Sequence, residues 1–156
     1  MKNRKRVFLD ATAYNEAIKG SEFHNCFAAA MSITRRVKND MQFNLKDGQD
    51  IGLSFIMLCN RYKINVKQVS SMADVKGKYA FVVLGWFPVK VSYFLFYDYK
   101  YIDFHVFRIN PDGTILNKAD FTSPAKDLKN LDEPDLYDYR EELRLGDYKI
   151  FVLDDE

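Results

Sequence analysis

Cys26 and His105 carry the chemistry that this sequence suggests most strongly. The 156-residue chain contains two cysteines and two histidines, so a thiol and an imidazole that act together have few alternatives. A thiolate is a strong nucleophile, and a helix N-terminus or a nearby imidazolium lowers the pKa of a thiol. Such a pair supports attack on a carbonyl, a thioester intermediate and its release to water or to an amine.

A helix must present Cys26, and the pattern around it predicts one from Cys26 to about Asn39. Asn25 is the expected N-cap, because its side-chain oxygen can accept from a free amide one turn later. Cys26 is then the first helical residue. Residues at steps of three and four share one face of this helix: Cys26, Ala29, Ala30, Ile33 and Val37.

A second helix is predicted from Asp50 to about Tyr62, with Cys59 on its apolar side as a buried core thiol. Beyond it, β-branched and aromatic residues predict about five strands: 79–87, 91–99, 101–109, 114–117 and 148–153. The polar segment 122–144 reads as a long surface loop with a helical turn near 133–143. Helices that precede an antiparallel sheet indicate an α+β fold.

The turn Asn110-Pro111-Asp112-Gly113 gives His105 a face and a neighbour. Proline at the second position presets a type I turn, and glycine at the fourth accepts positive φ. The resulting three-residue loop sets Asn110 opposite Thr114. His105 and Asn117 are then diagonal neighbours on one face of the sheet.

The third member of a catalytic triad therefore has two candidates. Asn117 is favoured, and it would orient the imidazole through its second nitrogen. If the turn closed as a two-residue loop at Asp112-Gly113, His105 would instead face Asp120. For the oxyanion, the backbone amide of Cys26 is one candidate donor, and the side chains of Asn15 and Asn25 are further candidates.

The chain also resembles a family of papain-like proteins found in bacteria and some eukaryotes. The matching residues are Tyr14-Asn15, the run from His24 to Met31, the block Asp103-Phe104-His105-Val106-Phe107-Arg108, the Asp112-Gly113 hairpin and the Asn117-Lys118 pair. The resemblance implies a papain-like fold, Cys26 as nucleophile and His105 as base. The family usually has His-Lys-Pro-Gly where this chain has residues 117–120, so the resemblance leaves the third residue open. This chain also has no recognisable glutamine at the position that usually supplies the oxyanion donor in papain-like proteins.

Length, charge and motif content exclude several other classes of function. The length predicts a single domain over residues 1–156, and the net charge of +1 gives no electrostatic reason to expect nucleic acid or an anionic membrane as a partner. Neither a zinc-ligand pattern nor a phosphate-binding glycine loop is present, so no metal or cofactor is expected. Two cysteines form no disulfide framework, and the sequence shows no signal-peptide or membrane-span pattern. We expect a cytoplasmic protein, or one exported without a cleaved signal peptide.

Two functions follow from these patterns. The first is a cysteine hydrolase that cleaves a peptide, isopeptide or amide bond, with Cys26, His105 and Asn117 as its triad and a protein or peptide as its substrate. The second is a non-catalytic interaction module on the same fold, such as an effector or inhibitor that binds a host or partner protein. In the second case Cys26 is a buried small residue and His105 is a core histidine.

Overall fold

A computed structural model describes residues 7–19, 24–35, 50–93 and 96–154, with only the backbone between residues 86 and 103. Three α-helices precede the first strand: α1 (Ala11–Ala17), α2 (Cys26–Ala30) and α3 (Ile51–Arg61). The strands are β1 (Val66–Val69), β2 (Ala80–Tyr93), β3 (Phe96–Ile109), β4 (Ile115–Lys118), β5 (Ala125–Leu128) and β6 (Lys149–Leu153). Short helices lie between them: η2 (Met72–Val75), η3 (Pro134–Tyr139) and α4 (Arg140–Leu145).

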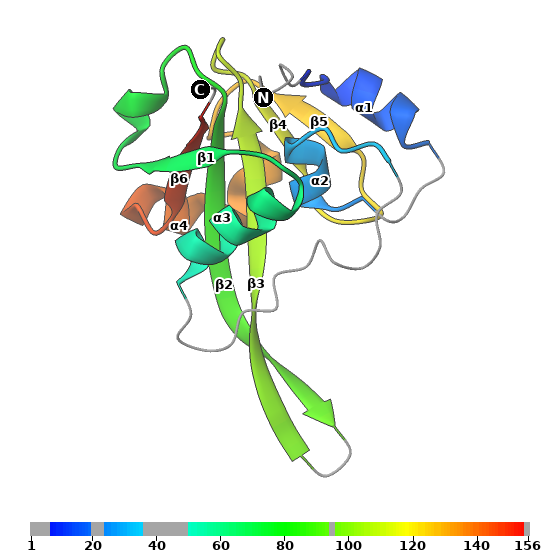
Figure 1. The fold of residues 1–156 in the computed structure, drawn as a ribbon, viewed down its shortest axis with the longest axis vertical. Coiled ribbons are helices and arrows are strands. Elements are labelled where there is room, and N and C mark those ends of the chain that lie inside the picture. Colours follow the sequence, from blue (N-terminus) through cyan, green and yellow to red (C-terminus); the bar gives the residue numbers. More distant parts are fainter. Residues whose placement is uncertain (1–6, 20–23, 36–49, 94–95, 155–156) are drawn as a thin grey trace.

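The strands form one antiparallel sheet of six, in the order β1-β6-β2-β3-β4-β5. N-terminal helices pack against this sheet, which confirms the predicted α+β class. In Figure 1, α2 and α3 lie on the near side of the sheet and α4 lies behind it. The strands β2 and β3 continue past the other strands as a long two-stranded hairpin (Figure 1).

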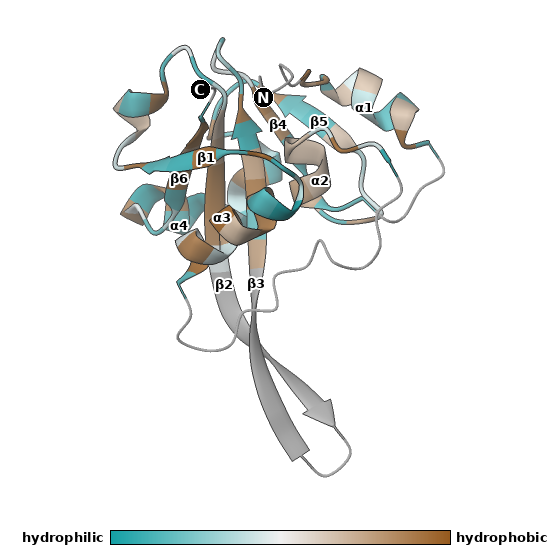
Figure 2. Ribbon diagram, viewed as in Figure 1, coloured by the Kyte–Doolittle hydropathy of each residue, from teal (hydrophilic) through white to brown (hydrophobic). Residues whose placement is uncertain are grey.

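Strand alternation divides the core into one layer on each face of the sheet. On the face under α2 and α3, Phe81, Val83 and Val106 pack with helix residues such as Phe27 and Phe55. The neighbouring strands β2 and β6 are correspondingly apolar where the helices cover them (Figure 2).

The opposite face has its own core, built from the alternate residues of the same strands. Val82, Leu84 and Phe107 pack there with Leu136 and Tyr139 of η3. Both faces of the central strands are therefore buried, and a residue's position in the pleat decides which helices it can contact.

The hairpin loop between β3 and β4 agrees with its prediction. The Asn110 amide donates to the Thr114 carbonyl at 2.8 Å, the Gly113 amide donates to the Asn110 carbonyl at 2.9 Å, and Gly113 has φ +89°. Strand pairing then follows as Ile109 opposite Ile115 and Arg108 opposite Leu116. This register rules out the two-residue loop that would have set His105 opposite Asp120.

The two predicted helices differ in how well they match. The predicted helix 50–62 is confirmed as α3 with Asp50 as its N-cap. The predicted helix 26–39 begins correctly, with the Asn25 side chain accepting from the Ala28 amide at 3.0 Å, but it ends at Ala30. Ser32 adopts φ +54°, which a helix cannot continue through, and residues 36–39 lie outside the described range.

The predicted strands differ from the observed ones in number and in length. The runs 79–87, 91–99 and 101–109 form two long strands, because Gly85 and Pro88 flank a register shift inside β2 and do not end it. Within the supposed loop 122–144, residues 125–128 form β5, while the expected helical turn near 133–143 is confirmed by η3 and α4. The helix α1 and the strand β1 were not predicted.

Candidate functional site

Two residues of the predicted triad, His105 and Asn117, form a buried hydrogen bond. The Nε2 of His105 lies 2.6 Å from the Oδ1 of Asn117, and both residues are buried. An amide oxygen only accepts, so Nε2 is the donor in this hydrogen bond. In the neutral imidazole Nδ1 then carries the lone pair, which is the tautomer that a general base needs.

Tyr139, a residue that sequence reasoning missed, covers this pair. Its ring stacks on the His105 ring with centroids 4.5 Å apart and an interplanar angle of 4°. Tyr139 is the last residue of η3, which packs on the same sheet face as Leu84 and Phe107. The only sequence signal for this element is the expected helical turn near residues 133–143, and it does not indicate that Tyr139 stacks on His105.

Cys26 belongs to the other side of the sheet, and it is not near the His105–Asn117 pair. The helix α2 packs against β3 and β4 through Phe27, Ala28 and Ala30, on the face that Val106 shares. His105 precedes Val106 in the pleat and therefore points to the η3 face. Alternation along the strands is enough to place His105 beside Asn117. It does not tell which face of the sheet α2 covers, and the predicted meeting of Cys26 with His105 depends on that face.

The helix α2 gives Cys26 a defined orientation along the sheet. The Nη1 of Arg108 donates to the carbonyl of Ala30 at 3.1 Å, so the C-terminal end of α2 lies within reach of the Arg108 side chain. Ala29 packs in one cluster with Leu116. Cys26 opens the helix at the opposite end and is 7% exposed.

Lys118 is a buried cation on the α2 face of β4. It is 2% exposed, and it follows Asn117 in the pleat, so its side chain lies on the same face as that of Leu116. Its Nζ donates to the backbone carbonyl of Asp120. Burial lowers the pKa of Lys118, and the charges of Asp120 and Cys26 oppose this shift.

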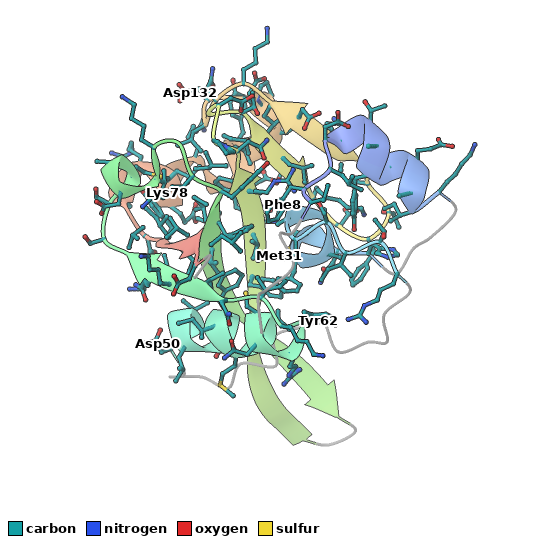
Figure 3. All side chains as sticks on the ribbon, turned by 45° about the horizontal axis from the view of Figure 1, so that its top comes forward. Phe8, Met31, Asp50, Tyr62, Lys78 and Asp132 are labelled. Carbon is teal, nitrogen blue, oxygen red and sulfur yellow. The ribbon has the colours of Figure 1, made fainter. Side chains whose placement is uncertain are left out.

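Arg108 ties together three segments around α2. Besides Ala30, its guanidinium donates to the Leu9 carbonyl at 2.6 Å, to the Ser32 Oγ at 3.1 Å and to the Asn110 Oδ1 at 2.8 Å. Its Cζ lies 4.9 Å from the centroid of the Phe8 ring, which lies over the sheet (Figure 3). Burial lowers the pKa of Arg108 to about 10, and the charges of Tyr79, Asp127 and Asp10 partly oppose this.

The candidate oxyanion donors have other partners in the structure. Asn15 pairs with the backbone of Ala125 in β5, donating to its carbonyl and accepting from its amide, each at 2.8 Å. The side-chain oxygen of Asn25 caps α2. The oxyanion role of these residues and of the Cys26 amide stays a prediction.

The remaining candidates also have structural places. The Asp120 carboxylate accepts from the backbone amides of Thr122 and Ser123 at 2.9 and 2.7 Å, which shapes the turn after β4. The ring of His24, two residues before Cys26, has its Nε2 2.9 Å from the carbonyl of Arg35. Cys59 is fully buried in the core cluster under α3, as predicted.

Within the described residues, no three histidine, cysteine, aspartate or glutamate side chains group in a way that would hold a metal ion, and no helix has the length and apolar character to cross a membrane. No protein-family model, no curated protein and no solved structure matches this chain.

Proposed function

We propose that this chain is a papain-like cysteine hydrolase that cleaves a peptide, isopeptide or related amide bond in a protein or peptide substrate. Cys26 is the nucleophile, and His105, oriented by Asn117, is the acid and base. The observation that carries the proposal is the buried His105–Asn117 hydrogen bond, because it fixes the basic tautomer of the imidazole.

The chemistry proceeds in two steps. In the first, His105 accepts the thiol proton, the sulfur bonds to the carbonyl carbon, and the imidazolium returns the proton to the departing amine. In the second, water attacks the thioester with His105 as base, which releases the acid and restores the thiol. Deamidation and amine transfer use the same thioester, with ammonia as the leaving group or an amine in place of water.

Two features support Cys26 as the nucleophile. It is the first residue of a capped helix, where free backbone amides favour a thiolate. In addition, α2 packs on the two strands that carry His105 and Asn117. The pairing between β3 and β4 consists of Arg108–Leu116 and Ile109–Ile115, so the ladder ends before it reaches His105 and Asn117. The proposal requires the Cys26 sulfur to reach Nδ1 at this end of the ladder during the reaction.

A second candidate function is a non-catalytic interaction module, such as an effector or inhibitor. The observation that favours it is burial, since Cys26 is 7% exposed and His105 is 2% exposed. In that case the His105–Asn117 pair is a satisfied polar contact of the core, stacked under Tyr139.

Thiol labelling separates the two functions. Iodoacetamide is added to the folded protein at neutral pH, and the alkylated peptides are quantified by mass spectrometry over time. For a hydrolase we expect Cys26 to label faster than Cys59. We also expect His105→Ala and Asn117→Ala to slow labelling of Cys26 by about tenfold or more, since both remove the oriented base.

Cys59 serves as the internal control for folding, because it is fully buried in the core. A variant in which Cys59 becomes reactive has lost its fold and is replaced by the milder His105→Gln. Slow and equal labelling of the two cysteines, unaffected by His105→Ala, would support the interaction module and overturn the hydrolase.

A further inference from the structure

We propose that the buried ammonium group of Lys118 is the counter-ion of the Cys26 thiolate. This inference rests on the proposed function and deepens it by naming the residue that stabilises the nucleophile. Lys118 is then a positioning residue that acts through the thiol.

The fold places Lys118 on the sheet face that α2 covers. Arg108 and Leu116 are paired across β3 and β4, and they contact the C-terminal end of α2 through Ala30 and Ala29. Lys118 lies two residues beyond Leu116 on the same face, about 6 to 7 Å further along the strand. Cys26 lies about one helical turn, or roughly 5 Å, before Ala29 and Ala30. Cys26 and Lys118 therefore both lie within a short distance of the contact between Ala29 and Leu116, on the same face of the sheet.

The burial of Lys118 strengthens the attraction between its ammonium group and a thiolate on Cys26. A lysine that is 2% exposed has lost most of its water, and in the described contacts its Nζ donates to one backbone carbonyl, that of Asp120. A neutral carbonyl compensates an ammonium charge only partly, so a nearby anion gains attraction in this low-dielectric surrounding. The charge on Cys26 raises the pKa of Lys118 against the larger effect of burial. Because coupling between two sites is reciprocal, Lys118 must favour the thiolate by the same free energy.

Other ionisable groups surround the α2 region. They include His24 just before the helix, Tyr14 of α1 in edge contact with His24, Tyr62 against Phe27, Asp120 after β4, Arg108 near the C-terminal end of α2, and His105 on the other sheet face. Asp120 is an anion and opposes a thiolate, whereas Arg108 donates to the Ala30 carbonyl at the C-terminal end of α2, away from Cys26. Lys118 is therefore the cation to substitute first.

The test is the pH dependence of Cys26 alkylation by iodoacetamide, in which the thiolate displaces iodide. Lys118→Met removes the charge with little change in volume, and Lys118→Arg is the matched control that keeps it. We expect Lys118→Met to raise the midpoint of the profile by about one pH unit or more, with about tenfold slower labelling at pH 7. Lys118→Arg should restore most of the shift.

The same pair of profiles is measured in a His105→Ala background. The shift caused by Lys118→Met should persist there, because it does not depend on the imidazole. An unchanged midpoint in both backgrounds overturns the role of Lys118 and leaves the hydrolase proposal untouched. An unaffected labelling rate in His105→Ala, with a shift in Lys118→Met, overturns the hydrolase and keeps the ion pair.

If Lys118→Met does not fold, the thiolate is titrated directly in the Cys59→Ser protein by its ultraviolet absorbance. A midpoint clearly below about 8.5, the usual value for a free thiol, that rises in Lys118→Gln, a variant that can still donate to the Asp120 carbonyl, supports Lys118 as the cationic neighbour. A midpoint above that value shows that burial dominates and overturns the inference.

Discussion

The rings of His105 and Tyr139 are stacked, with an interplanar angle of 4° and their centroids 4.5 Å apart. Tyr139 thereby forms one wall of the place where His105 meets Asn117 and keeps water from the hydrogen bond between them. A hydrogen bond in such surroundings is stronger than one in water, and the ring it orients has fewer alternatives. The short helix η3 therefore serves the candidate site as well as the core.

Tyr139→Ala tests this cover. Removal of a buried aromatic ring should lower the free energy of unfolding by about 3 kcal/mol, measured by urea denaturation. The His105–Asn117 bond should also weaken, which NMR detects as faster solvent exchange of the imidazole proton on Nε2. Tyr139→Phe keeps the stacked ring and is the control, so it should retain slow exchange. Slow exchange in Tyr139→Ala would show that the ring does not shield the pair.

Arg108→Met should destabilise the protein by about 3 to 5 kcal/mol, because it leaves the carbonyls of Leu9 and Ala30 without their shared donor inside the core. Arg108→Lys keeps the charge but not the forked geometry, so we expect an intermediate loss. Urea denaturation measures both variants. Hydrogen exchange should show the added opening in residues 9–10 and 30–33 first; uniform opening of the whole chain would contradict the local clamp.

The sequence could predict the His105–Asn117 pair because its determinants are local. Asn110, Pro111 and Gly113 fix the turn, the turn fixes the register, and the pleat then fixes which side chains are neighbours. The N-cap Asn25 and the start of α2 at Cys26 were predictable for the same reason. Each of these depends on residues a few positions apart.

The relation between Cys26 and His105 depends on contacts that span the chain, and the sequence could not supply it. Which sheet face α2 covers is decided by apolar packing of Phe27 and Ala28 and by the Arg108 clamp, whose partners lie 78 and 99 residues away. The strand β5 could not be predicted because its four residues, Ala125–Leu128, do not alternate, and contacts with distant residues such as Asn15 and Ala11 hold it in place. Gly85 and Pro88 predict the end of a strand, but in the structure they flank a register shift inside β2, and the strand continues beyond them.

Tyr14 predicts a pH dependence of stability at alkaline pH. Its hydroxyl is buried and donates to the Ile33 carbonyl at 2.7 Å, and burial raises the pKa of Tyr14 well above the usual value of about 10. An acid whose pKa is raised by folding contributes its full stabilisation below the unfolded value and loses it as the pH rises above about 10. The free energy of unfolding should therefore fall on going from about pH 9 to 11.

Tyr14→Phe isolates that contribution. It should cost about 1 kcal/mol at neutral pH through the lost hydrogen bond, and its own decline between about pH 9 and 11 should be shallower than that of the wild type. Urea denaturation at each pH measures both. Parallel declines in the two proteins would assign the alkaline loss to other groups.

Asp120→Asn and Asn117→Ala distinguish the two candidates for the third residue. The Asp120 carboxylate accepts from Thr122 and Ser123 in the turn after β4, and these bonds hold its pKa below the usual range. Asp120→Asn should then weaken the turn slightly and leave Cys26 alkylation at neutral pH within about twofold of the wild type. Asn117→Ala removes the acceptor of the His105 Nε2 proton and should slow alkylation about tenfold or more, because the imidazole loses its fixed tautomer. If Asp120→Asn slowed the reaction more than Asn117→Ala, the carboxylate would be the orienting group, and the register between β3 and β4 would have to change when substrate binds.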